Sequence, residues 1–280
     1  MKLIRAISIA TKELQKKGIK SALLDSELLL SKAINKKREF IILNSSYNIN
    51  KNNIKDFWKL IHQRSKGKPV AYLTGKKFFW KHEFKINDKV LIPRPDTEII
   101  VEQILNLYRN KKKISFIDVG TGSGCILLSI LKERKDFKGT GLDLSSSALK
   151  ICDYNAEKLR VKNRIKLFKT DIDKFGAGKY DLVISNPPYI KNLDLKYLDK
   201  EVVNFEPRLA LDGGIDGLSE IRKVIKKSSE LIKRGGKLIL EIAFDQREKV
   251  KKLLRNNNFY INSVVKDLAK NDRCIISTRK

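Results

Sequence analysis

The run of residues best suited to catalysis is Asn186, Pro187, Pro188 and Tyr189, which directly follows the β-rich run 181–185. The side-chain oxygen of Asn186 and the backbone carbonyl of Pro187 can each accept an N–H from a planar amino group. This would draw a delocalised nitrogen toward tetrahedral character and aim its lone pair at an electrophile. A stiffened turn would explain the two prolines, but not Asn186 and the flat ring of Tyr189 beside them. We therefore predict catalysis at a conjugated amino nitrogen, with Asn186, Pro187 and Tyr189 as catalytic residues and the whole run 186–189 binding the substrate.

A glycine-rich run follows the β-rich stretch 114–119 and precedes a helical pattern that begins near Cys125. Its glycines allow a tight turn and close approach to a ligand. The G-x-G-x-G spacing is one residue short of the dinucleotide-binding loop, which favours a nucleoside without phosphates, such as S-adenosylmethionine. The carboxylate of this cofactor suits a helix N-terminus, and its ammonium group suits an acidic side chain. The predicted contacts are Asp118, Gly120, Thr121, Gly122, Ser123, Gly124 and Asn186.

Asp143 ends the next β-rich run, 139–144, roughly 20 residues past the glycines, where a carboxylate can accept the ribose hydroxyls of such a cofactor. A tight turn without any ligand is the alternative for the glycines alone, but it does not account for Asp143. After the third run, Asp171 either faces the adenine edge or caps a helix, and Ile172 next to it is a further candidate contact.

The surrounding pattern divides the chain into three parts. Residues 1–75 are helical, with one apolar stripe through Leu23, Leu24 and Leu28. Residues 76–95 show aromatic alternation around Asn87, which predicts a hairpin linker. Residues 96–280 alternate helical patterns with short β-rich runs, which predicts a mostly parallel sheet with helices on both faces and a ligand at the carboxyl ends of its strands. The predicted strands are 114–119, 139–144, 165–169, 181–185, 236–242, 259–265 and 273–278, the last two pairing antiparallel at an edge.

Composition narrows the possible classes of protein. The 280 residues carry 60 Lys and Arg against 32 Asp and Glu, a net charge of +28, which reflects either attraction to an acidic partner or compositional bias. Three separated cysteines and two histidines make a metal site or a Ser-His-Asp relay improbable on chemical grounds, and they suit a reducing compartment. No run approaches the ~20 apolar residues of a membrane span. We expect a cytoplasmic protein that needs neither metal nor membrane.

The chain resembles the release factor glutamine methyltransferases of the PrmC/HemK family over essentially its whole length. Besides 118–124 and 185–189, the resemblance includes four further segments: Pro69-Val-Ala-Tyr-Leu-Thr-Gly75, Ile92-Pro-Arg-Pro-Asp-Thr-Glu98, Phe205-Glu-Pro-Arg-Leu-Ala-Leu211 and Asp267-Leu-Ala-Lys-Asn-Asp-Arg273.

This resemblance implies a Rossmann-like, class I methyltransferase domain with a seven-stranded sheet and an N-terminal helical domain that docks the substrate. It implies N5-methylation of the glutamine in the Gly-Gly-Gln loop of class 1 peptide chain release factors, in transient proximity to the ribosome. Gly120 to Gly124 and Asp143 would contact S-adenosylmethionine, and Asn186 to Tyr189 would hold the glutamine. Ile172 stands where the family commonly has an aromatic residue near the adenine.

Two other functions compete with this hypothesis. The Asn-Pro-Pro-Tyr run is shared with adenine-N6 and guanine-N2 methyltransferases, and the positive charge fits a nucleic-acid substrate. A ribonucleoprotein-binding module that retains a cofactor fold without catalysis is the third possibility. Flanking residues leave two more questions open. Pro93 to Asp96 form either a rigid linker or, through Arg94 or Glu98, a border of the target pocket, and Glu206 with Arg208 either locks the catalytic loop or acts in catalysis.

Overall fold

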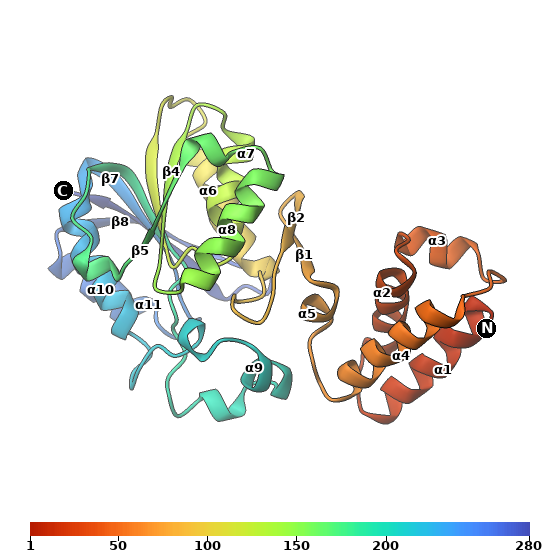
Figure 1. Ribbon diagram of the computed structural model, residues 1–280. Coiled ribbons are helices and arrows are strands. Elements are labelled where there is room, and N and C mark those ends of the chain that lie inside the picture. Colours follow the sequence, from red (N-terminus) through yellow and green to blue (C-terminus); the bar gives the residue numbers. More distant parts are fainter. The chain divides into compact units, whose positions relative to one another are not determined.

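The computed structural model describes residues 1–280, which divide into two compact units. The first unit contains Met1–Lys76 together with Asp199–Phe205. The second contains Lys77–Leu198 and Glu206–Lys280 (Figure 1). The short segment Asp199–Phe205 thus belongs to the first unit although both its neighbours in sequence belong to the second. None of the helices combines the length and the apolar character that a bilayer crossing requires.

The first unit is a bundle of helices. Apolar residues of its first helix recur every three or four positions, at Leu3, Ala6, Ala10 and Leu14, and all four are buried. The helices are α1 (Leu3–Lys16), α2 (Ala22–Ile34), α3 (Arg38–Leu43), α4 (Lys51–Ser65), α5 (Val70–Thr74) and α9 (Lys200–Phe205).

The expected apolar stripe of α2 is wrong at two of its positions. Leu23 and Leu24 are exposed, whereas Asp25 is buried and its carboxylate accepts from Arg64 Nε at 2.7 Å. Arg64 is itself buried and also pairs with Glu201 of α9 at 2.7 Å. A buried charge is stable only when paired, so this ion pair turns the Asp25 side of α2 inward. Hydrophobic periodicity cannot reveal such a partner.

The predicted hairpin exists, but its turn lies elsewhere. Strands β1 (Lys76–Phe79) and β2 (His82–Lys85) are joined at Trp80 and Lys81, not at Asn87–Asp88. Trp80 has a φ of 56°, and two acidic side chains hold it: its backbone N–H donates to Glu98 at 2.7 Å and its indole N–H to Glu133 at 2.9 Å. These long-range bonds stabilise a left-handed conformation that the local sequence does not favour.

The second unit is built on a seven-stranded sheet in the order β5-β4-β3-β6-β7-β9-β8. All seven predicted runs are strands. They are β3 (Ser115–Val119), β4 (Lys138–Asp143), β5 (Ile165–Lys169), β6 (Tyr180–Ser185), β7 (Ile232–Glu241), β8 (Phe259–Lys266) and β9 (Asp272–Arg279). The first five are parallel, β9 lies antiparallel to β7, and β8 pairs antiparallel with β9 at the edge, as expected.

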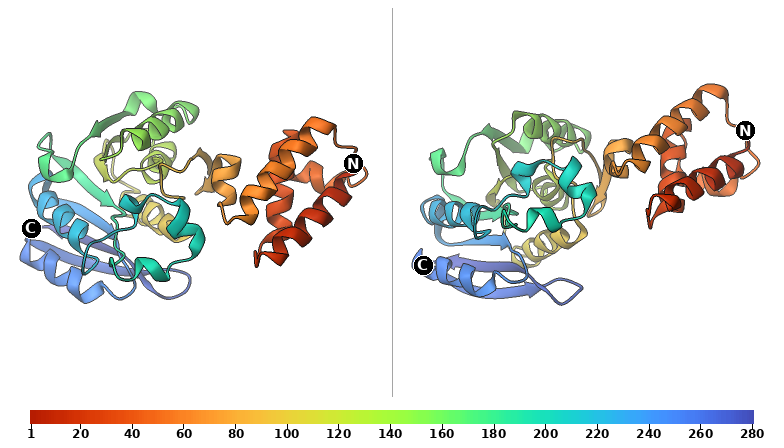
Figure 2. Two further views of the ribbon diagram at one scale, coloured as in Figure 1. Left: turned by 60° about the horizontal axis from the view of Figure 1, so that its bottom comes forward. Right: turned by 90° about the horizontal axis from the view of Figure 1, so that it is seen from below.

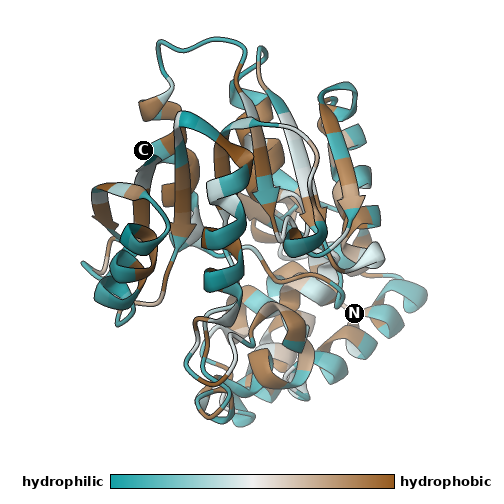
Figure 3. Ribbon diagram, turned by 90° about the vertical axis from the view of Figure 1, so that its left-hand side faces the viewer, coloured by the Kyte–Doolittle hydropathy of each residue, from teal (hydrophilic) through white to brown (hydrophobic).

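Helices cover both faces of this sheet (Figures 1 and 2). One face carries α6 (Glu98–Leu107), α7 (Cys125–Glu133) and α8 (Ser146–Lys158), and the other carries α10 (Ser219–Leu231) and α11 (Arg247–Asn256). Alternate residues of β3 pack on opposite faces of the sheet. Phe116 contacts Phe137 on one face, whereas Ile117 lies in the core cluster with Ile221 of α10 on the other. Figure 3 shows the resulting brown strands between helices whose outer sides are teal.

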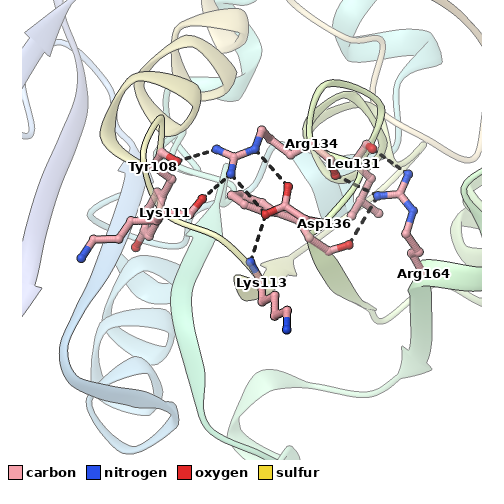
Figure 4. A network of polar contacts seen from close by, with 8 residues as sticks. Tyr108, Lys111, Lys113, Leu131, Arg134, Asp136 and Arg164 are labelled. Atoms are coloured by element: carbon pink, nitrogen blue, oxygen red, sulfur yellow. Dashed lines mark hydrogen bonds and ion pairs between the residues drawn. The ribbon is translucent and has the colours of Figure 1, made fainter.

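Two arginines fix the end of α7 that lies away from the glycine-rich run (Figure 4). Arg134 donates to the carbonyls of Tyr108 and Lys111, and Arg164 donates to the carbonyl of Leu131 at 2.7 Å. Helix C-termini leave carbonyl groups without intrahelical partners, and Arg164 satisfies one of these. The helix that starts at the glycine turn is therefore anchored at its other end.

Candidate functional site

The glycine turn connects β3 to α7 and is shaped by backbone bonds. Gly120, Gly122 and Gly124 all have positive φ, at 75°, 56° and 81°. The N–H groups of Gly120 and Thr121 both donate to the carbonyl of Leu142 at 2.9 Å. A Cβ on Gly120 would meet nothing within 4 Å, whereas one on Gly124 would lie 2.6 Å from Cys152 Sγ. Gly120 therefore borders open space, and Gly124 serves close packing of α7.

Asp118 lies beneath this turn and is 1% exposed. Its Oδ2 accepts from the Thr121 hydroxyl at 2.8 Å, and its Oδ1 has no hydrogen-bond partner. Burial raises the pKa of Asp118 to about 7, against the effect of the Thr121 bond. A buried carboxylate is costly, and Asp118 is held beneath the turn by the Thr121 hydroxyl.

Asp143 ends β4 beside the turn. Its Oδ2 accepts from the N–H of Gly122 at 2.9 Å and its Oδ1 from that of Ser145 at 2.8 Å. Burial raises its pKa, and these backbone bonds oppose that rise. Asp143 therefore shapes the glycine turn from the neighbouring strand. Each carboxylate oxygen still has a lone pair with which it can accept a hydroxyl.

Asp171 and Ile172 follow β5. The side chain of Asp171 caps the short helix Ile172–Lys174 by accepting from Asp173 N at 3.1 Å. Asp171 also lines the cavity described below, and its contact with the adenine edge stays a prediction. Ile172 is buried and lines the same cavity. It thereby offers an aliphatic surface where a planar group could pack.

The loop after β6 is held by side chains from distant parts of the chain. Asn186 Nδ2 donates to the hydroxyl of Thr97 at 3.2 Å, and the Tyr189 hydroxyl donates to Glu241 Oε1 at 3.3 Å. Gln246 Nε2 donates to the carbonyl of Tyr189 at 3.1 Å. A Cβ on Gly217 would lie 2.5 Å from that carbonyl, so only glycine fits there.

A cavity of about 430 Å³ joins these loops within the second unit. This is a usual size for a small-molecule site. Of the predicted residues, it is lined by Gly120, Gly122, Asp143, Asp171, Ile172, Asn186, Pro187 and Pro188. Asp118, Thr121, Ser123, Gly124 and Tyr189 are not among its lining residues. Four of these support the glycine turn, and Tyr189 is anchored to Glu241. The role of Tyr189 as a wall for the target group stays a prediction.

The cavity carries negative charge although the chain as a whole is strongly positive. Its lining contains the carboxylates of Asp88, Asp143, Asp171, Asp212 and Glu220 against the single ammonium group of Lys89. Lys223 lies 2.8 Å from Glu220 and 3.7 Å from Asp171, Lys89 lies 3.5 Å from Asp88, and Arg208 lies 3.3 Å from Asp212. Three cations thus compensate most of this charge, and Asp143 is the lining carboxylate with no ion pair. An acidic lining favours a cationic ligand and disfavours phosphate groups. The structure contains no group of three or more His, Cys, Asp or Glu arranged to hold a metal ion.

Several residues of the site escaped the sequence reasoning. Thr97, Glu241 and Asn155 hold the two loops, and Leu209 with Val224 adds apolar lining. Glu241 could have been found, because it ends a predicted strand at the carboxyl edge of the sheet, where ligands bind. Asn155 gave no signal: its amide reaches the carbonyls of Ser123 and Lys85 only in the folded chain.

The open questions on the flanking segments have structural answers. Glu206 is buried and accepts from the N–H of Ile92 at 3.2 Å and from the Arg94 guanidinium. Glu98 is directed toward Trp80. Neither Arg94 nor Glu98 is among the residues that line the cavity, and Glu206 holds the segment around Ile92.

Comparison with known proteins agrees with this architecture. Residues 5–75 match the PrmC N-terminal domain, and residues 95–209 match the methyltransferase small domain. The solved structure of a ribosomal protein L11 methylase from Lactobacillus delbrueckii subsp. bulgaricus superposes with a TM-score of 0.50 at 21% identity, covering 68% of this chain and 82% of that one. The fold and the site define a class I methyltransferase that uses S-adenosylmethionine.

Two relatives identify the family to which the chain belongs. The chain is 36% identical over 278 residues to the release factor glutamine methyltransferase of Caulobacter vibrioides, covering 99% of this chain and 96% of that one. It is 38% identical over 260 residues to that of Clostridium acetobutylicum, covering 91% and 90%. The chain belongs to the release factor glutamine methyltransferase family.

Proposed function

We propose that this protein transfers a methyl group from S-adenosylmethionine to the side-chain amide nitrogen of the glutamine in the Gly-Gly-Gln loop of class 1 peptide chain release factors. The observation that carries the proposal is one cavity lined both by the glycine turn with Asp143 and by Asn186, Pro187 and Pro188. Membership of the family supports the release factor as substrate.

We assign the cofactor to the acidic side of the cavity. Gly120 and Gly122 leave room for it, and Asp143 suits its ribose hydroxyls. Asp118 holds the glycine turn from beneath through Thr121 and does not line the cavity. Ile172 and Val224 provide aliphatic packing for the adenine in place of an aromatic ring. When bound, S-adenosylmethionine supplies a sulfonium-activated methyl group.

The target amide is assigned to the loop after β6. Its nitrogen lone pair is delocalised into its carbonyl, so alignment matters more than a strong base. Asn186 Nδ2 is engaged by Thr97, which leaves Asn186 Oδ1 as the end of the side chain that can accept an N–H of the target. The Pro187 carbonyl accepts the other N–H, and the proton can depart to water after transfer.

The partner and the division of labour follow from the same proposal. The helical domain, residues 1–75, would dock the release factor, and residues 96–280 would carry out transfer in the cytoplasm, with transient proximity to the ribosome. Residues 76–95 connect the two.

A labelling experiment tests the function. The full chain is incubated with methyl-labelled S-adenosylmethionine and a class 1 release factor, beside the same factor with its Gly-Gly-Gln glutamine changed to alanine. Label is expected in the first factor and not in the second. Label that persists in the changed factor, or that enters RNA or DNA without any protein acceptor, would contradict the proposal and favour an amino methyltransferase of nucleic acid.

A further inference from the structure

Glu241 is a buried carboxylate that the mechanism above does not use. It is the last residue of β7 and is 2% exposed. Ser185 at the end of β6 pairs with Leu240, so Glu241 lies one position further along, level with the start of the Asn186–Tyr189 loop. A buried acid at the carboxyl edge of the sheet is costly unless it has partners or a role.

The carboxylate of Glu241 contacts one end of this loop directly and the other through Thr97. The Tyr189 hydroxyl donates to its Oε1 at 3.3 Å. At the other end, Asn186 Nδ2 donates to Thr97, and the Thr97 hydroxyl lies close enough to Glu241 to lower its pKa. Glu241 does not line the cavity, so it acts on these residues and not on the reacting atoms.

Each hydrogen bond of this network has a defined donor and acceptor. Thr97 is buried, and its hydroxyl oxygen accepts from Asn186, so the hydroxyl proton needs an acceptor of its own. Glu241 Oε2 is buried and has a free lone pair, and the Thr97 hydroxyl interacts with this carboxylate, so Glu241 is the acceptor for that proton. An ionised Glu241 can accept hydrogen bonds from the Thr97 and Tyr189 hydroxyls together, whereas a protonated one offers fewer acceptor sites.

Charged groups around Glu241 influence its ionisation in both directions. Burial raises its pKa to about 7, Arg273 of β9 opposes this rise, and Asp96 adds to it. Arg273 is itself held by Asp267 at 3.0 Å and lies 3.8 Å from Asp96. The thiols of Cys125 and Cys274, which also face it, have pKa values raised by burial and stay neutral.

We propose that Glu241 is a positioning residue for methyl transfer. By accepting from Tyr189 and Thr97, it fixes the loop and turns Asn186 so that its Oδ1 meets the target amide. This inference rests on the proposed function, because the target amide is the substrate assigned there.

The test compares Glu241→Gln with the unchanged chain. Glutamine keeps the shape of the side chain but removes its charge and one acceptor site. The expected result is a fall in kcat on the order of 100-fold, as for a misaligned reacting group. Calorimetric affinity for S-adenosylmethionine should stay unchanged. The kcat of the unchanged chain should rise with pH through about 7, as Glu241 ionises, and this limb should disappear in the variant. Glu241→Asp, which keeps the charge, should restore part of the rate.

Two controls separate positioning from general damage. Glu248→Gln, on the exposed side of α11, should change neither rate nor pH profile. Tyr189→Phe keeps the ring and removes only the hydroxyl that reaches Glu241, so its effect should be smaller and should not add fully to that of Glu241→Gln.

The opposite outcomes are equally distinct. Unchanged kcat and pH profile in Glu241→Gln, or full additivity with Tyr189→Phe, would overturn the positioning role. A loss of rate that merely follows a loss of cofactor affinity would do the same. If the unchanged chain fails to label the release factor, the proposed function fails instead.

Discussion

The two loops that line the cavity are held in different ways. The glycine turn after β3 is fixed by its own backbone and by the adjacent strand, through the carbonyl of Leu142 and the carboxylate of Asp143. The loop after β6 is fixed by side chains far away in the chain, Thr97 at a separation of 89 residues and Glu241 at 52.

The two loops should therefore be sensitive to different kinds of substitution. A turn made by glycine geometry fails when a side chain is added to it, because φ above zero and close packing exclude Cβ. A loop held by distant polar side chains fails when one hydrogen-bonding atom is removed. Substitutions in the first should therefore act mainly on stability and cofactor binding, and substitutions in the second on turnover.

The largest effect is expected from Asn186→Ala. Removal of the amide oxygen that receives the target should lower kcat/KM by on the order of 100- to 1,000-fold, or about 3–4 kcal/mol of transition-state stabilisation. Steady-state methylation kinetics measure this, with Asn110→Ala, an exposed site, as control. Turnover within a few-fold of the unchanged chain would remove Asn186 from the mechanism.

Gly124→Ala should produce the next largest change, in folding and not in turnover. Its Cβ would lie 2.6 Å from Cys152 and 2.9 Å from Leu128 at a φ of 81°, so strain and overpacking should together cost about 3 kcal/mol. Urea denaturation measures the loss. Gly235 has a similar φ of 78°, but a Cβ there would meet open space. Gly235→Ala should therefore lose only the stability that backbone strain costs. Equal losses in the two variants would contradict the packing role.

The buried Asp118 should make the cofactor-free protein less stable as pH rises. In the folded chain the pKa of Asp118 is about 7, above its ordinary value of 3.8. Its contribution to the free energy of unfolding is therefore complete below about pH 4 and is lost by about pH 7. When the pH is raised from 5.5 to 8, the free energy of unfolding should therefore fall by about 2 kcal/mol less in Asp118→Asn than in the unchanged chain. Denaturation at the two pH values tests this.

Asp216 provides a control of opposite sign. Its bond with Arg222 lowers the pKa of Asp216 to about 2, so the stability that this ion pair contributes is complete above about pH 4 and is lost only in acid. Asp216→Asn should therefore change the free energy of unfolding by the same amount at about pH 5.5 and at about pH 8. A difference at pH 8 relative to 5.5 in this variant, or none in Asp118→Asn, would count against the assignment.

The smallest effect on stability is expected from Gly120→Ala. A Cβ there meets no atom within 4 Å, so only the left-handed strain of about 1 kcal/mol remains. Gly18→Ala is a matched control, with a φ of 76° and open space outside the cavity. Both should lose equal stability, but only Gly120→Ala should weaken S-adenosylmethionine binding in calorimetry. Equal affinities of the two variants for S-adenosylmethionine would contradict the assignment of the cofactor to the glycine turn.

Local pattern alone predicted the regular parts of the second unit. The β-rich runs carry enough β-branched and apolar residues to define strands, and parallel order follows from their alternation with helices. It failed where a distant partner decides the conformation. Trp80 takes a positive φ because Glu98 and Glu133 hold it, and Asp25 is buried because Arg64 reaches it.

The same distinction between local and long-range information applies to the site. The amino acid sequence by itself determined the glycine turn, Asp143 and the Asn186–Tyr189 run, because each is a short segment whose chemistry and spacing are read locally. Only the tertiary structure decided that Tyr189 is tied to Glu241, that Thr97 orients Asn186, and that five carboxylates surround the cavity of a basic protein. These groups lie on different strands and loops, and no local periodicity connects residues that meet only when the sheet forms.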